Sequence, residues 1–298
     1  MLGHGATGDI AGWHAHPDVW LLIAILAGGY WLLVKRVGPR FTQPGESSKA
    51  ASRFQVVCFA LGVAAVWVAS DWPIHDVAEG SMYSVHMVQH LVLTMVAAPL
   101  LLLGTPGWLA RWLLRPPSAL FRAVRLLSRF LPALIVFNVV LVLTHWPALV
   151  NETVASHPLH FVVHALIFVT AFIVWMPVLS PLPEIPRLAA PTQAVFLFLQ
   201  SIVPTVPASF LTFGEHPLYA AYRGLPHLWG LSTLEDQQTA GLIMKIGAGM
   251  LLWALIAVIF FRWAADEDRR NQPQQIRREL ERELEQIRAE SADQGVRP

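Results

Sequence analysis

Charged residues and cysteine are both scarce in this chain of 298 residues. Only 14% of the residues are charged, whereas soluble globular domains carry about 25%. The single cysteine, Cys58, lies in an apolar run, which excludes an internal disulfide and every metal or redox motif that needs two thiols. The formal net charge of +1 gives no electrostatic reason to expect nucleic acid as a partner. These shortages argue against a soluble domain, a disulfide scaffold and a nucleic-acid-binding protein.

Apolar residues, by contrast, make up 55% of the chain and gather in long runs. A helix needs about 20 consecutive, mostly apolar residues to cross a bilayer. The alternation that marks the strands of a membrane barrel is absent, so the runs are expected to be helical. There are seven runs, at about residues 18–35, 54–72, 83–103, 132–150, 158–180, 191–213 and 238–262. The sequence thus predicts an all-α integral membrane bundle of seven transmembrane helices in a lipid bilayer.

Lysine and arginine are concentrated in alternate connections between these runs. The connections after the first, third and fifth runs, and the segment after the seventh, hold Lys35, Arg36, Arg40, Lys49, Arg53, Arg111, Arg115, Arg122, Arg125, Arg129, Arg187 and Arg262. The connections on the other side hold only Arg223. Basic connections stay in the cytoplasm, so the N-terminus is predicted outside and the C-terminus inside. The predicted parts are an external leader (1–17), a transmembrane domain (18–263) and a charged cytoplasmic helical tail (264–298).

Histidines recur at a spacing of four residues inside two of the apolar runs. His86 and His90 lie near the start of one run, and His160 and His164 lie near the start of another. Residues four apart on a helix share a face, with their Cβ atoms about 5–6 Å apart. Both runs are predicted to pass from outside to inside, so the two pairs should lie at a similar depth. His145 ends the run between them at that level. The spacing therefore predicts an outer pocket lined by imidazoles.

A pocket of neutral imidazoles suits zinc, copper, iron or nickel, and copper has the highest affinity in the divalent series. Thioether sulfurs would favour Cu(I). Hard cations such as Mg²⁺ are not expected, because no carboxylate lies in the outer half of either histidine-bearing run. An ionisable side chain inside a span is itself a functional candidate. The predicted metal ligands are His86, His90, His145, His160 and His164, with Met82, Met87, Met244, Lys245 and Asp236 as possible additions.

Four stretches of the sequence together resemble a known family. They are HMVQHLVLTMVAAPLLLLGTP from residue 86, THWPALV from residue 144, LHFVVHALIF from residue 159 and DQQTAGLIMKIGAG from residue 236. These stretches are similar to the multi-pass CtaG proteins, which are assembly factors for bacterial haem–copper cytochrome c oxidases. The resemblance extends over about residues 54–262. Within it, Lys245 departs from the pattern, which would have an apolar or aromatic residue there.

The resemblance implies a multi-pass protein of the bacterial cytoplasmic (inner) membrane that handles copper for the metal centres of the oxidase. Its expected partners are the oxidase subunits or other assembly factors. The motif histidines carried over are the five of the predicted pocket, and Asp236, Gly241 and Met244 match the motif of the last run. An enzyme is not expected, because the sequence has no nucleophile–base motif, phosphate loop or zinc-protease motif.

Two other functions are compatible with the same histidines. A copper transporter would use the pocket as the place where the ion enters the membrane. A haem protein would take one axial imidazole from each of two helices at matching depth. The residues alone predict an outer imidazole pocket that suits copper. The link to an oxidase comes from the resemblance.

Overall fold

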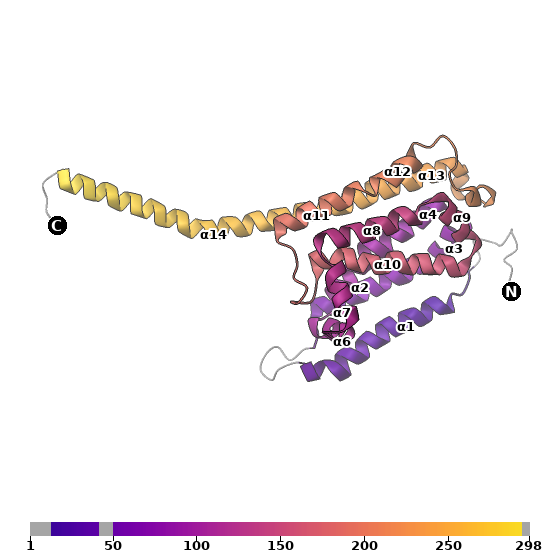
Figure 1. Ribbon diagram of the computed structural model, residues 1–298, viewed down its shortest axis with the longest axis horizontal. Coiled ribbons are helices and arrows are strands. Elements are labelled where there is room, and N and C mark those ends of the chain that lie inside the picture. Colours follow the sequence, from indigo (N-terminus) through magenta and orange to yellow (C-terminus); the bar gives the residue numbers. More distant parts are fainter. Residues whose placement is uncertain (1–12, 42–49, 294–298) are drawn as a thin grey trace.

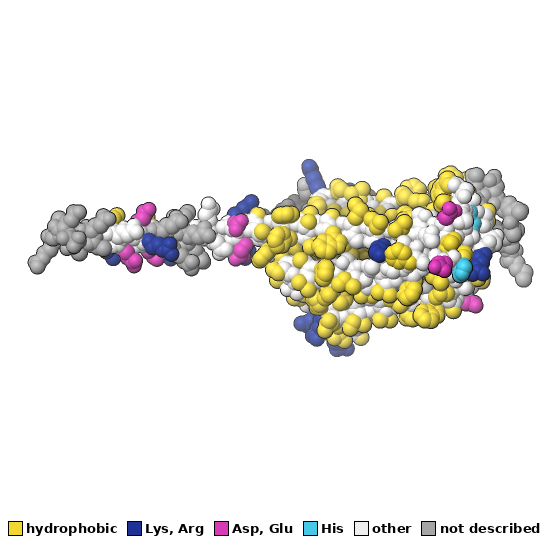
Figure 2. Space-filling view, turned by 90° about the horizontal axis from the view of Figure 1, so that it is seen from above, with side chains coloured by type: hydrophobic (Ala, Val, Ile, Leu, Met, Phe, Trp, Pro, Cys, Tyr) yellow, Lys and Arg dark blue, Asp and Glu magenta, His cyan; other side chains and the backbone are white. Residues whose placement is uncertain are grey.

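The molecule is an elongated bundle of helices from which one long helix projects (Figure 1). The computed structural model describes residues 13–41 and 50–293, and within these ranges every regular element is helical. In this described part, six helices are long and apolar enough to cross a membrane, or seven if one bent pair counts as a span. Figure 2 shows a broad apolar surface over the middle of the bundle, with most charged side chains at its ends. The predicted all-α, multi-pass membrane class is confirmed.

Several spans consist of more than one helical segment. The first is α1 (Pro17–Leu32) followed by the turns η1 (Leu33–Val37) and η2 (Gly38–Phe41), and the second is α2 (Arg53–Ser70). The remaining candidates are α4 (Tyr83–Leu91) with η3 (Val92–Ala97) and α5 (Ala98–Gly104); α10 (His157–Leu179); α11 (Ala190–Ile202) with α12 (Thr205–Thr212); and α13 (Thr233–Leu242) with η6 (Ile243–Gly247) and α14 (Ala248–Asp293). The π-helical turns η1, η3 and η6 interrupt three of these spans.

Short helices close the two ends of the bundle. At one end lie α3 (Ile74–Gly80) and α9 (Pro147–Ala155), beside the first turns of α4, α10 and α13 (Figure 1). We call this end the histidine end, because it contains His86 and His160. The turns η4 (Ala220–Gly224) and η5 (Leu228–Gly230) belong to the loop before α13. At the opposite end lie α6 (Gly107–Leu114) and α7 (Ala119–Leu127) (Figure 1), which carry Arg111, Arg122 and Arg125.

The span predicted at residues 132–150 is shorter than expected. Its helix, α8 (Phe130–Thr144), ends before His145, and Pro147 begins the separate helix α9. A proline lacks the N–H that would continue the preceding helix but fits the first turn of a new one. With 15 residues, α8 reaches the length of a span only together with α7, from which it is bent by 88°. The predicted count of seven spans therefore depends on how this bent pair is counted.

Close backbone contacts hold the bundle together. A Cβ atom at Gly104 would lie 2.6 Å from the Cα atom of Phe59, so α5 and α2 approach each other where no side chain fits between them. The hydroxyl of Tyr30 in α1 donates a hydrogen bond of 2.9 Å to the Gly104 carbonyl. Small residues of this kind allow membrane helices to pack closely. Phe137 of α8 and Phe196 of α11 are buried in the main core.

The last helix, α14, leaves the bundle and continues beyond it as one bent helix (Figure 1). It runs from Ala248 to Asp293 without an interruption. The apolar side chains of Leu280, Leu284 and Ile287 are exposed along its far half. The boundary predicted at residue 264 thus marks a change of composition inside one helix.

Candidate metal site

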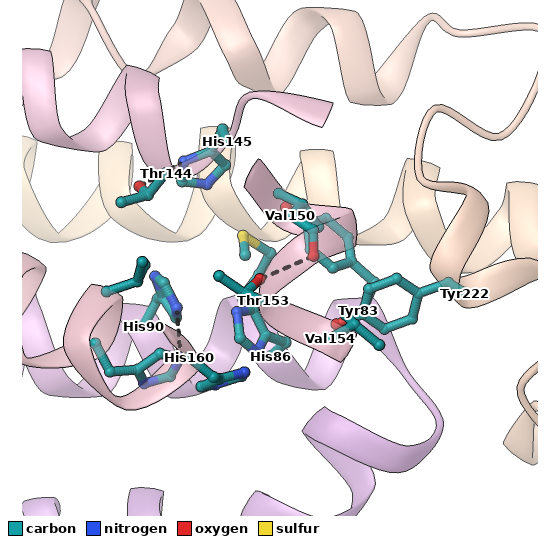
Figure 3. A pocket seen from close by; sticks show the side chains of 13 residues that line it. Tyr83, His86, His90, Thr144, His145, Val150, Thr153, Val154, His160 and Tyr222 are labelled. Carbon is teal, nitrogen blue, oxygen red and sulfur yellow. Dashed lines mark hydrogen bonds between the residues drawn. The ribbon is translucent and has the colours of Figure 1, made fainter. Parts of the chain in front are cut away.

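Two helices bring four histidines together at the histidine end. His86 and His90 are one turn apart on α4, and His160 and His164 are one turn apart on α10. Figure 3 shows the rings of His86, His90 and His160 grouped together, with His145 to one side. The ring centroid of His86 lies 5.4 Å from that of His160 and 5.1 Å from that of His164. The two pairs that the spacing identifies therefore converge.

The ring nitrogens are close enough to bind one ion. His86, His160 and His164 each offer a ligand nitrogen, and the three nitrogens lie within 4.8 Å of one another. The Nε2 atoms of His90 and His164 are 3.2 Å apart. Two nitrogens arranged tetrahedrally at about 2.0 Å from a metal would be about 3.3 Å apart. His164 therefore belongs both to the group of three, with His86 and His160, and to a close pair with His90. In both cases the distances between the nitrogen atoms suit metal coordination.

The cavity between these rings is small and largely closed. Its volume is about 10 Å³, and its walls include Tyr83, Met87, Thr144, His145 and Tyr222 besides the four histidines. This volume admits about one water-sized particle. The space therefore matches a single ion and has no room for a macrocycle.

Several ring nitrogens in and beside the cluster are buried without a hydrogen-bond partner. They are Nδ1 of His86, Nδ1 of His90, Nε2 of His145 and Nε2 of His160. A buried polar atom without a partner costs about 1–3 kcal/mol. A metal ion that accepted these lone pairs would offset part of that cost, so the nitrogens fit a metal site better than a purely structural cluster.

His145 is held at the edge of the cluster by its own helix. Its Nδ1 atom donates a hydrogen bond of 2.6 Å to the carbonyl of Leu141 in the last turn of α8. The hydroxyl of Tyr219 donates to the His145 carbonyl at 3.0 Å. The hydrogen bond at Nδ1 leaves Nε2 as the free lone pair, as is usual for a histidine that binds metal. Its ring centroid is 6.3 Å from that of His90, so His145 is farther from the others.

Asp236 sets the position of the helix that carries His86 and His90. Its two carboxylate oxygens accept hydrogen bonds from the backbone N–H groups of Tyr83 (2.7 Å) and Ser84 (3.1 Å) in the first turn of α4. A carboxylate at this position satisfies free N–H groups and interacts favourably with the helix dipole. Asp236 is 1% exposed and does not line the histidine cavity. Its contacts are those of a helix cap.

Of the other additional candidates, only Met87 lines the histidine cavity. Met82 and Met244 are buried but do not line it. Lys245 lines a separate and much larger groove, of about 900 Å³, between α11–α12 and the last span. Its Nζ atom lies 5.3 Å from the ring centroid of Phe213. The structure thus brings together the five predicted histidines and Met87.

The sequence reasoning missed Glu79, which reaches the cluster from α3. Its Oε1 atom lies 3.3 Å from Nε2 of His75 and 3.2 Å from Nε2 of His160, the latter without hydrogen-bond geometry. Burial, with the nearby charges of Asp76 and Asp18, raises the pKa of the Glu79 carboxyl to about 7. The available signal was the spacing of four between His75 and Glu79 in the connection at residues 71–82.

The fold and the cluster define a multi-pass helical membrane protein with a buried site that can hold a metal ion. The model of the family "Cytochrome c oxidase caa3 assembly factor (Caa3_CtaG)" matches residues 28–266. The chain therefore belongs to this family of oxidase assembly factors, which confirms the resemblance found in the sequence. The comparisons with curated proteins and with solved structures give no match.

Proposed function

We propose that this protein binds copper in the histidine cluster and supports delivery of the ion to a haem–copper oxidase, as a non-catalytic assembly factor. The observation that carries the proposal is the convergence of His86, His160 and His164, with His90 at 3.2 Å from His164. These residues come from two helices that are far apart in the sequence. A purely structural role would not require four imidazoles to face one small cavity.

The chemistry of the ligands favours copper over other cations. Imidazole nitrogens suit copper and zinc, and a thioether adds preference for Cu(I). Met87, the one sulfur ligand among the residues lining the cavity, supplies that thioether. Mg²⁺ and Ca²⁺ need several oxygen ligands, whereas the nearest carboxylate, Glu79, contacts the cluster only at its edge.

The distribution of charge supports placing this site on the outer side of the bacterial cytoplasmic membrane. The arginines of α6 and α7 lie at the end of the bundle opposite the histidines. By the positive-inside rule, that basic end faces the cytoplasm. The histidine end would then face outward, and the partners would be oxidase subunits or other assembly factors.

Copper analysis of the purified full-length protein tests the site. We expect bound copper in the wild type and loss of that copper in the double variant His90→Ala with His164→Ala, because the variant removes the closest pair of nitrogens. His216→Ala, which replaces an exposed histidine outside the cavity, is the control and should keep the wild-type copper content. Unchanged copper in the double variant would overturn the site.

A cellular experiment tests the assembly role. Deletion of the gene should lower oxidase activity and the copper content of the oxidase, while the amount of oxidase transcript stays constant. The wild-type gene should restore both, and the double histidine variant should not. An oxidase with full activity and intact copper in the deletion strain would contradict the proposal.

Two measurements separate this function from the alternatives. The cavity of about 10 Å³ favours an ion over haem, so the purified protein should have no Soret absorption band. An assembly factor that loads copper from outside should leave the uptake of copper into whole cells unchanged. A strong Soret band would favour the haem protein, and lowered uptake in the deletion strain would favour the transporter.

A further inference from the structure

A groove runs between α11–α12 and the last span. Its volume is about 900 Å³, which is within the range of about 300–1,000 Å³ that is usual for small-molecule sites. Figure 2 views the molecule from the side of α11 and α12, where the surface is largely apolar. The walls of the groove include Ile202, Val206, Phe210, Phe213 and Trp253, and all five side chains are exposed. The groove therefore opens toward the surroundings of the bundle, which in a membrane are lipid.

A helix break and small residues create this space. Val203 and Pro204 separate α11 from α12. On the opposite wall, a Cβ atom added to Gly249 of α14 would meet nothing within 4 Å. The hydroxyls of Ser201 and Ser209 also line the groove, and each donates a hydrogen bond of 2.7 Å to a carbonyl of its own segment. The floor is therefore open, and the donors of these two hydroxyls are already satisfied.

Lys245 brings a positive charge into this apolar groove. Among the described residues that line the groove, it is the one with a charged side chain. Its Nζ atom lies 5.3 Å from the ring centroid of Phe213. Within residues 13–41 and 50–293, no ion pair involves Lys245. Ionisable side chains inside membrane spans normally pair with a group of opposite charge, so the groove suits a ligand that supplies a negative charge.

The position of this charge along the groove indicates the shape of the ligand. Lys245 lies toward the histidine end, whereas Trp253 is eight residues further along the last span, a distance of about 12 Å at 1.5 Å per residue. The long stem of a lysine can extend its ammonium group to the level of the lipid headgroups. A cation at one end and an apolar channel leading from it match a phospholipid, which has an anionic headgroup and apolar chains.

We propose that this groove binds one anionic phospholipid, whose phosphate pairs with Lys245 and one of whose acyl chains lies between α12 and α14. A lysine ammonium has three N–H donors for phosphate oxygens. A membrane-spanning helix of a partner fits less well, because a cylinder about 10 Å wide and 30 Å long occupies about 2,400 Å³, more than the groove holds. The groove shares no described lining residue with the histidine cavity, so lipid binding does not depend on copper.

Native mass spectrometry of the full-length protein, titrated with phosphatidylglycerol or phosphatidylcholine that carry identical acyl chains, tests the lipid site. In the wild type we expect one bound phosphatidylglycerol, with an affinity about 5-fold or more above that for phosphatidylcholine. Lys245→Met should abolish this preference, and Lys245→Arg should keep it. Lys35→Met is the matched control, because Lys35 also lies over an aromatic ring, at 5.4 Å from the centroid of Trp31, but does not line the groove.

Two further measurements separate a lipid from free phosphate and from a partner helix. Gly249→Leu, which adds a side chain to the open floor, should weaken binding of phosphatidylglycerol while Lys245 stays in place, and melting by circular dichroism would verify that the variant is folded. Excess inorganic phosphate should not displace the lipid. Displacement by phosphate, or full affinity in Gly249→Leu, would overturn the role of the acyl chain. Equal affinity for the two lipids in the wild type, or an unchanged preference in Lys245→Met, would overturn the lipid site and favour a carboxylate of a partner helix as the counter-charge.

Discussion

The Oδ2 atom of Asp236 accepts a hydrogen bond of 2.7 Å from the backbone N–H of Tyr83, 153 residues earlier in the chain. This contact fixes the first turn of α4 against α13. It ties the last span to the helix that carries His86 and His90. The geometry of the histidine cluster therefore depends on a residue that does not line its cavity.

Replacing Asp236 should destabilise the protein and disturb the site together. Asp236→Ala leaves two buried N–H groups without their acceptor, at a cost of about 2–4 kcal/mol, and should lower the melting temperature by roughly 5–10 °C. Asp236→Asn keeps one carbonyl oxygen and should have an intermediate effect. Thermal melting and copper titration on the same samples measure both quantities. Glu235→Gln is the control, because its side chain is exposed and the capping box with Ser232 tolerates glutamine. Wild-type melting and affinity in Asp236→Ala would show that the cap is dispensable.

Gly241 should tolerate no side chain. A Cβ atom there would lie 2.8 Å from the Ala208 carbonyl and closer still to the Thr212 side chain, so α12 and α13 would have to separate. Gly241→Ala should cost about 1–3 kcal/mol, as overpacking typically does. Gly249→Ala is the matched control, because nothing lies within 4 Å of its added Cβ atom. Melting temperatures of the two variants decide the question, and equal values would contradict the close packing.

His145 should contribute to copper affinity without being essential. Its available nitrogen faces the cluster from the edge, so His145→Ala should raise the copper Kd about 10-fold and leave the stoichiometry unchanged. Competition with a chelator of known affinity measures this change. Thr153→Val is a suitable control, because Thr153 lines the same cavity while its hydroxyl already donates to the Val150 carbonyl. Loss of the ion in His145→Ala would make His145 a principal ligand, and an unchanged Kd would exclude it from the site.

Copper should stabilise the folded protein by mass action. At a free concentration about 100 times the Kd, binding adds about 2.7 kcal/mol and should raise the melting temperature by roughly 5–10 °C. A chelator should reverse the increase. The variant His90→Ala with His164→Ala should show neither effect. An equal increase in that variant would mean that the ion stabilises the protein elsewhere.

The parts of the site that depend on spacing within one helix were predictable from the sequence. The pairs His86 with His90 and His160 with His164 follow from the helical repeat, and their common depth follows from the charge of the connections. The contacts of Asp236 with Tyr83 and of Glu79 with His160 join elements that are distant in the sequence. Helical periodicity carries no information about such contacts, so the cap and the nearby carboxylate emerge only from the fold.

The end of α8 was mispredicted for a local reason. Apolar residues continue through Val150, so hydropathy alone extends the span, whereas Pro147 begins a new helix after His145. A proline inside an apolar run is tolerated in membrane helices. The sequence therefore left two outcomes open at Pro147, and tertiary packing selected the broken one. This break puts His145 at a helix end with a free ring nitrogen.

The unbroken course of α14 has a mechanical consequence. Its 46 residues extend for about 69 Å at 1.5 Å per residue, more than twice the roughly 30 Å of a hydrocarbon core. A continuous helix transmits rotation and tilt along its axis. A small tilt of its membrane half against α11 would therefore displace the far end of the charged half by a larger distance.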